Sequence, residues 1–99
     1  MTDIEIINLK LKEDYIIDLI GMGNVGYSWV HDIDKENIVS ISHEYIVPPN
    51  PKPGDRGIER FTIRGIQSGS CIIEFRQIQS WEKDQPPFSV RKFQVHVRN

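Results

Sequence analysis

Apolar and polar residues alternate along most of the chain, with a period of two residues. This pattern is typical of half-buried β-strands, in which successive side chains point to opposite faces of a sheet. No stretch has the period of an amphipathic helix. The expected strands are residues 4–11, 15–20, 27–31, 38–42, 45–47, 59–64, 71–78 and 88–97.

Glycine and proline mark three long loops between these strands. Residues 21–26 contain three glycines, and residues 48–57 contain four prolines. The third loop, residues 79–87, contains Trp81 and two further prolines. Because glycine permits positive φ angles and proline lacks a backbone donor, these segments are expected to interrupt the strands and to form shaped surface loops.

The last strand shows a change of phase. Its apolar positions shift from Phe88 and Val90 to Phe93, Val95 and Val97, which predicts a β-bulge. Seven or eight short strands without a helix are typical of an immunoglobulin-like, two-sheet β-sandwich. We therefore expect an all-β fold with one domain spanning residues 1–99.

Composition supports this fold class and narrows the partners. The chain has 16 Ile and 7 Val but only 3 Leu and no Ala, and β-branched residues favour strands. Its 12 Lys and Arg are scattered among 14 Asp and Glu, so no basic face for nucleic acid is expected. The first 20 residues carry acids and lack the features of a secretory leader, so we expect a cytoplasmic protein without a membrane partner.

The sequence contains few candidates for catalytic or metal-binding residues. Cys71 lies in an apolar run typical of a buried strand, and the flanking valines place His96 on the opposite, solvated face. His31 and His43 each lack a second His or Cys at a metal-binding spacing. We expect no catalytic residue, no metal, no cofactor and no enzymatic activity.

The three loops are the better candidates for function. In a Greek-key sandwich, the loops between strands B and C, D and E, and F and G can emerge at the same end, as antibody paratope loops do. Loops on a rigid scaffold commonly carry binding residues. The pattern alone leaves open that these loops merely connect strands.

Motifs in these loops resemble those of the chagasin-like inhibitors of papain-family cysteine peptidases. They are Gly26-Tyr27-Ser28-Trp29, Gly54-Asp55-Arg56-Gly57-Ile58-Glu59-Arg60-Phe61, and Gly69 followed after eleven residues by Trp81-Glu82. The family carries an Asn-Pro-Thr-Thr-Gly-aromatic-x-Trp motif in its first loop. Its second and third loops carry Gly-x-Gly-Gly and Arg-Pro-Trp motifs. The resemblance extends over nearly the whole chain.

The chain departs from each motif. Met22-Gly23-Asn24-Val25 stands in place of Asn-Pro-Thr-Thr, so an apolar valine replaces a hydroxyl group. Arg56 replaces a glycine of the second motif and adds a positive charge. Gln79 and Ser80 replace the Arg and Pro of the third motif.

The resemblance implies a reversible, non-covalent inhibitor of papain-like, cathepsin L-like cysteine peptidases. A monomer would form a one-to-one complex, with the first loop over the catalytic cysteine and the other two gripping the cleft walls. Trp81 is the expected anchor, and Tyr27 and Trp29 are expected to fill the core beneath the first loop. The implied contact residues are Gly23, Asn24, Val25, Gly26, Gly54, Asp55, Arg56, Gly57, Gln79 and Trp81. The alternative is a non-inhibitory immunoglobulin-like interaction or adhesion module.

Overall fold

The computed structural model describes residues 3–21, 26–47, 49, 56–79, 81 and 84–99. These residues form seven strands, and none of them forms a helix that is long and apolar enough to cross a membrane. The strands are β1 (Ile4–Lys10), β2 (Asp14–Ile20), β3 (Tyr27–Ile33), β4 (Val39–Ile46), β5 (Ile58–Gly65), β6 (Gly69–Gln79) and β7 (Ser89–Arg98).

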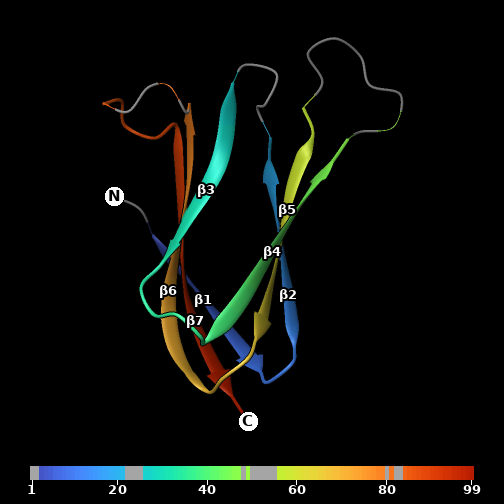
Figure 1. The fold of residues 1–99 in the computed structure, drawn as a ribbon, viewed down its shortest axis with the longest axis vertical. Coiled ribbons are helices and arrows are strands. Elements are labelled where there is room, and N and C mark those ends of the chain that lie inside the picture. The colour runs from blue at the N-terminus through green and yellow to red at the C-terminus, as the bar shows by residue number, and fades with distance from the viewer. Residues whose placement is uncertain (1–2, 22–25, 48, 50–55, 80, 82–83) are drawn as a thin grey trace.

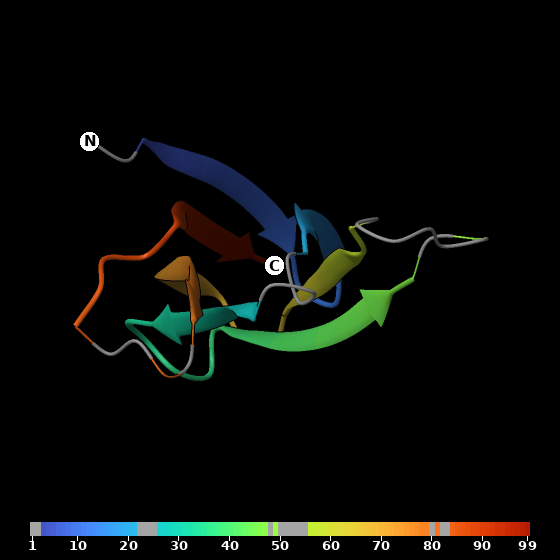
Figure 2. The same ribbon diagram turned by 90° about the horizontal axis from the view of Figure 1, so that it is seen from above.

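The strands form two sheets that pack as the layers of a sandwich (Figures 1 and 2). The four-stranded sheet has the order β1-β7-β6-β3, and the three-stranded sheet has the order β2-β5-β4. Strand β1 pairs with β7 in parallel, whereas the other pairs are antiparallel. This arrangement confirms the predicted all-β, immunoglobulin-like sandwich.

The strand ends that border the three loops lie at one end of the sandwich, at the top of Figure 1. In the three-stranded sheet, Ile20 at the end of β2 pairs with Ile58 at the start of β5, which pairs with Ile46 at the end of β4. In the other sheet, Tyr27 at the start of β3 pairs with Gln79 at the end of β6. The sandwich therefore brings the borders of all three loops together, as the sequence predicted.

The core lies between the sheets and consists of side chains from alternate strand positions. Phe61, Phe75 and Phe93 are almost fully buried there. The ring centroids of Phe61 and Phe75 are 4.7 Å apart, and those of Phe75 and Phe93 are 5.7 Å apart. These tilted and edge-to-face aromatic contacts connect the two layers and give the loop end a rigid support.

The two short strands predicted at residues 38–42 and 45–47 are one strand, β4, so that prediction was wrong. The polar residues between them do not interrupt the strand. His43 points inward and stacks on Phe61, with ring centroids 4.3 Å apart, and Glu44 faces Arg60 across the strand pair. Polar side chains are tolerated here because β4 lies at the edge of its sheet.

The predicted bulge in the last strand was also wrong. The pairing of β6 with β7 runs without interruption from Gly69 opposite Val97 to Gln77 opposite Ser89. Along β7, Arg91 therefore shares the face of Phe93, and its guanidinium carbon lies 5.1 Å from the centre of the Phe93 ring. The alternation of apolar residues changes phase because Arg91, whose stem is apolar, occupies an inner position near the opening of the sandwich.

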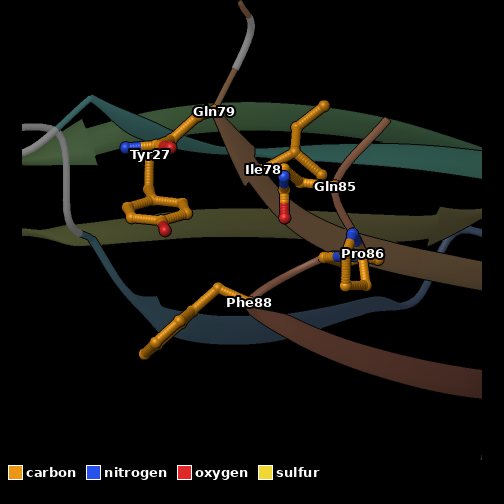
Figure 3. A pocket seen from close by; sticks show the side chains of 7 residues that line it. Tyr27, Ile78, Gln79, Gln85, Pro86 and Phe88 are labelled. Atoms are coloured by element: carbon orange, nitrogen blue, oxygen red, sulfur yellow. The ribbon is translucent and has the colours of Figure 1, made fainter. Parts of the chain in front are cut away.

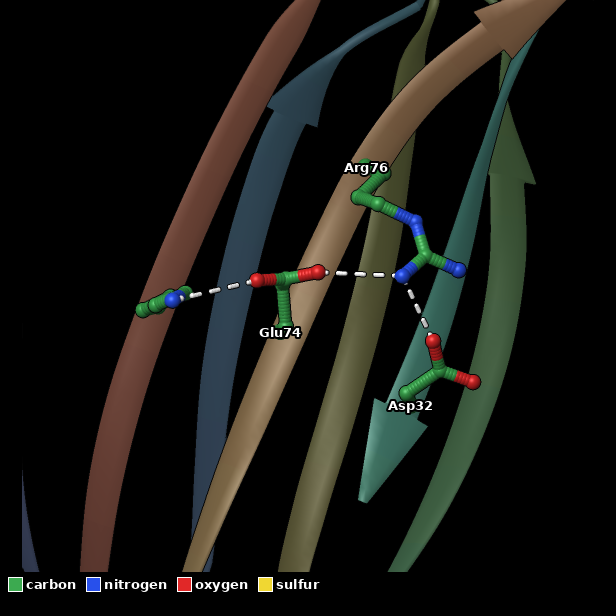
Figure 4. Close-up of polar contacts among 4 residues, drawn as sticks. Asp32, Glu74 and Arg76 are labelled. Carbon is green, nitrogen blue, oxygen red and sulfur yellow. Dashed lines mark hydrogen bonds and ion pairs between the residues drawn. The ribbon is translucent and has the colours of Figure 1, made fainter. Parts of the chain in front are cut away.

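The outer face of the four-stranded sheet carries matched charges across three strands (Figure 4). Arg76 contacts Asp32 at 2.6 Å and Glu74 at 3.0 Å, and Lys92 lies 3.3 Å from the other oxygen of Glu74. On the same face, His96 forms a 2.7 Å hydrogen bond with the Ser70 hydroxyl, which confirms its predicted outward position. The charges of this cluster are therefore paired with one another on the outer face.

Cys71 is buried in β6, as predicted. Burial raises the pKa of its thiol above the ordinary value of 9.0, and the negative charge of Asp34 adds to this effect. Because the neutral thiol is favoured in the folded state, its contribution to stability is complete below pH 9 and is lost as the pH rises through the elevated pKa.

We expect Cys71 to react slowly with a thiol reagent in the native protein and quickly after denaturation, since the thiolate is the nucleophile and the side chain is covered. Absorbance during reaction with a chromogenic disulfide measures both rates. Equal rates in the folded and unfolded states would contradict the buried position.

Candidate functional site

The first loop begins at a firmly held carbonyl group. The carbonyl oxygen of Ile20 accepts a hydrogen bond from Trp29 Nε1 at 3.0 Å and another from Gln77 Nε2 at 3.1 Å. Trp29 is 8% exposed and Gln77 is 2% exposed, so both donors act from within the core. Trp29 thus fills the core beneath the first loop, as predicted, and also positions the end of β2.

Gln77 was not predicted as a functional residue. Its signal in the sequence is a polar residue that continues the series of inward positions occupied by Cys71, Ile73 and Phe75. A buried amide needs hydrogen-bond partners, and here it finds one in the backbone at the start of the first loop. Gln77 therefore belongs to the support of the site.

The second loop is joined to the first at its own base. The backbone N–H of Gly21 donates to the carbonyl oxygen of Gly57 at 2.8 Å. A Cβ atom at Gly57 would lie 2.5 Å from Cζ of Tyr45 and 2.9 Å from the carbonyl oxygen of Ile46. Only glycine permits this approach without a shift of the neighbouring backbone.

We expect Gly57→Ala to destabilise the protein by about 1–3 kcal/mol, because the added methyl group overpacks against both a ring and a backbone carbonyl. Thermal unfolding followed by circular dichroism measures the loss. The change Gly57→Ala in a Tyr45→Ala background should cost less, and an equal cost in both backgrounds would contradict the contact with Tyr45.

A buried carboxylate lies two residues beyond Gly57. Glu59 is almost fully covered, and its Oε1 atom is 3.0 Å from Nε2 of His43. His43 is held in turn by its stacking on Phe61. This partner comes from the neighbouring strand β4, so the sequence around Glu59 does not predict it.

The third loop contacts the first through Trp81. This indole is 63% exposed, yet its ring lies against Gly26. A Cβ atom at Gly26 would lie 2.9 Å from Cζ3 and 3.0 Å from Cζ2 of Trp81. Gly26 also has a φ of 85°, a conformation that favours glycine. Gly26 therefore provides a flat support on which Trp81 presents its ring to solvent.

Tyr27 differs from its prediction. It is only half-buried, and its ring lies 5.3 Å from that of Phe88 rather than in the core beneath the first loop. The reason is its place at the start of β3, one step beyond the last core layer formed by Trp29 and Gln77. Together with Ile78, Gln79, Gln85, Pro86, Pro87 and Phe88, it lines a hollow of about 480 Å³ (Figure 3).

The structure describes five of the ten predicted contact residues: Gly26, Arg56, Gly57, Gln79 and Trp81. Gly23, Asn24, Val25, Gly54 and Asp55 lie outside the described residues. Gly26 and Trp81 are brought together, Gly57 is joined to the base of the first loop, and Gln79 lines the hollow beside Tyr27. Arg56 is exposed beside Gly57.

The described part of this end suits binding rather than bond cleavage. It presents the exposed indole of Trp81, glycines, and the paired rings of Tyr27 and Phe88. The thiol of Cys71 lies buried in β6. Among the described residues, no three His, Cys, Asp or Glu side chains come close enough to hold a metal ion. The geometry therefore offers contact area on a rigid frame.

Comparison with known proteins identifies the family. Residues 8–97 match the family model described as chagasin family peptidase inhibitor I42. The chain belongs to this family. An uncharacterised protein of Archaeoglobus fulgidus is 33% identical over 70 residues, which are 71% of this chain. The match spans 11% of the length of that relative.

Solved structures share the chagasin-family fold. The cysteine protease inhibitor EhICP2 from Entamoeba histolytica has a TM-score of 0.85 and 19% identity, covering 97% of this chain and 88% of its own. Amebosin has a TM-score of 0.69 and 27% identity, and the match covers 94% of this chain and 88% of the amebosin chain. PbICP-C, solved in complex with falcipain-2, has a TM-score of 0.66 and 20% identity. This match covers 98% of the present chain and 89% of the PbICP-C chain.

Proposed function

We propose that this chagasin-family protein is a reversible, non-covalent inhibitor of papain-like cysteine peptidases. It acts by seating the loop end of the sandwich over the active-site cleft of the peptidase. The observation that carries this proposal is the contact between Trp81 and Gly26, which joins the third and first loops into one exposed surface. Family membership supports the same function, and the names of EhICP2 and PbICP-C point to cysteine peptidases as targets.

The mechanism needs preorganisation rather than chemistry. Binding costs free energy when loops and side chains must be ordered, so loops fixed before the encounter bind more tightly. Here the bonds from Trp29 and Gln77 to Ile20, and the bond from Gly21 to Gly57, fix the bases of the first two loops. Trp81 then offers a large aromatic surface that becomes buried on binding.

A titration of papain and of a cathepsin L-like peptidase tests the proposal. Hydrolysis of a small fluorogenic substrate is followed at several enzyme concentrations. We expect inhibition with one-to-one stoichiometry, recovery of activity on dilution, and an inhibitor chain that remains uncleaved.

The absence of inhibition of both peptidases, by a protein shown to be folded, would overturn the proposal. Binding without inhibition would assign the same loop end to an interaction module instead. Size-exclusion chromatography of the mixture separates these two outcomes.

A further inference from the structure

A second hollow at the loop end lies between the end of β2 and the start of β7. Its volume is about 360 Å³. The buried side chains of Trp29 and Gln77 line it from within, and the exposed side chains of Ile20 and Phe88 border it. The hollow is therefore bordered by two apolar side chains. Toward the core it is lined by Trp29 and Gln77, whose side chains donate hydrogen bonds to the carbonyl oxygen of Ile20.

The described residues around this hollow carry one more positive than negative charge. The carboxylate of Asp18 is held by Arg60 through two bonds of 2.7 and 3.0 Å, which lower the pKa of Asp18. The guanidinium of Arg91 is held by Glu5 through bonds of 2.8 and 3.0 Å. Arg56, the remaining charged residue of the lining, is exposed and has no ion pair within the described part of the chain. Among the described residues, the positive charge of Arg56 is therefore unmatched.

All three loops border this hollow. Ile20 directly precedes the first loop, Arg56 lies near the end of the second, and Phe88 directly follows the third. A protein seated on the loop end would therefore meet this hollow at the edge of the same interface. A hollow with apolar borders and a guanidinium that has no ion pair among the described residues suits an occupant that carries a carboxylate next to apolar atoms.

We propose that this hollow receives an acidic side chain from the wall of the peptidase cleft, with its carboxylate on Arg56 and its aliphatic part between Ile20 and Phe88. The inference rests on the proposed inhibitory function and adds a specificity determinant to it. Arg56 stands where the family motif has glycine, so this contact favours peptidases with an Asp or Glu beside the cleft. A partly desolvated charge pair contributes through both association rate and residence time.

Inhibition constants of the wild type, Arg56→Gln and Arg56→Lys test the inference at low and high salt. We expect Arg56→Gln to weaken inhibition by about tenfold at low salt and to flatten the salt dependence, whereas Arg56→Lys retains part of the affinity. Arg98→Gln is the matched control, because Arg98 is also exposed and without an ion pair among the described residues but lies at the opposite end. Arg98→Gln should leave the inhibition constants at low and at high salt unchanged.

The partner is identified by replacing each Asp and Glu beside the peptidase cleft with its amide. We expect one such replacement to reproduce the loss caused by Arg56→Gln and to add nothing to it in a double-mutant cycle. A peptidase that the wild type and Arg56→Gln inhibit equally at both salt concentrations would overturn this inference and leave the proposed function intact. A wild-type protein that inhibits neither peptidase would overturn both.

Discussion

Trp81→Ala is expected to weaken peptidase binding by about 30-fold or more, which corresponds to about 2 kcal/mol. The indole is exposed in the free protein and rests on Gly26, so it loses little freedom when it is buried by a partner. Inhibition constants give the loss in affinity. Thermal unfolding of the same variant should change little, because the side chain contributes little to the core.

Ile66→Ala provides the matched control for this substitution. Ile66 is 49% exposed but lies in the turn between β5 and β6, at the end opposite the loops. Its truncation should leave inhibition unchanged. A large fall in the thermal midpoint of Trp81→Ala would mean that the indole stabilises the fold, and its assignment as an anchor would be wrong.

Gly26→Ala is expected to weaken binding by about tenfold, although the side chain is small. The added Cβ atom would occupy the space of the Trp81 ring, so the indole must move from its support. Alanine at a φ of 85° also costs about 1 kcal/mol or more of stability. Measured inhibition constants should show that the loss in binding depends on Trp81.

A double-mutant cycle separates the loss of the Trp81 position from backbone strain. In the Trp81→Ala background, Gly26→Ala should have a much smaller effect on inhibition, because the ring that it displaces is absent. Gly69→Ala is the control for strain, since Gly69 also has positive φ but lies at the opposite end and faces only the tip of Ile38. Equal losses with and without Trp81 would contradict the coupling of the two loops.

The hydrophobic pattern predicted most strands because alternation reports which side chains face the core. The regular spacing of Phe61 and Ile63, and of Cys71, Ile73 and Phe75, is reproduced in the buried positions. Alternation does not report which strand lies beside which. The parallel pairing of β1 with β7 joins residues that are almost a full chain apart, and no local signal encodes it.

The errors have local physical causes. The polar residues at positions 43 and 44 resemble a break, but stacking on Phe61 and pairing with β5 continue the strand. The apparent bulge in β7 arises because Arg91 takes an inner position and covers Phe93 with its stem and guanidinium. In both strands, a polar residue occupies an inward position where the alternation predicts an apolar residue.

The candidate site was predictable in its residue types but not in its contacts. Resemblance to the family motifs pointed to Gly26, Gly57 and Trp81. The reasons for glycine at the first two positions are tertiary, since they depend on the ring of Trp81 and the ring of Tyr45. Gln77 was missed because its role depends on a carbonyl group that is distant in sequence.

Protection of the peptidase's catalytic cysteine tests most directly whether the loop end covers the cleft. The rate of alkylation by iodoacetamide is measured for the peptidase alone, with one equivalent of the wild-type protein, and with one equivalent of Trp81→Ala. We predict that alkylation slows in proportion to the fraction of peptidase bound by the wild type, and much less with Trp81→Ala. Alkylation at the free rate, in a mixture shown by size-exclusion chromatography to be fully complexed, would contradict the proposed mode of inhibition.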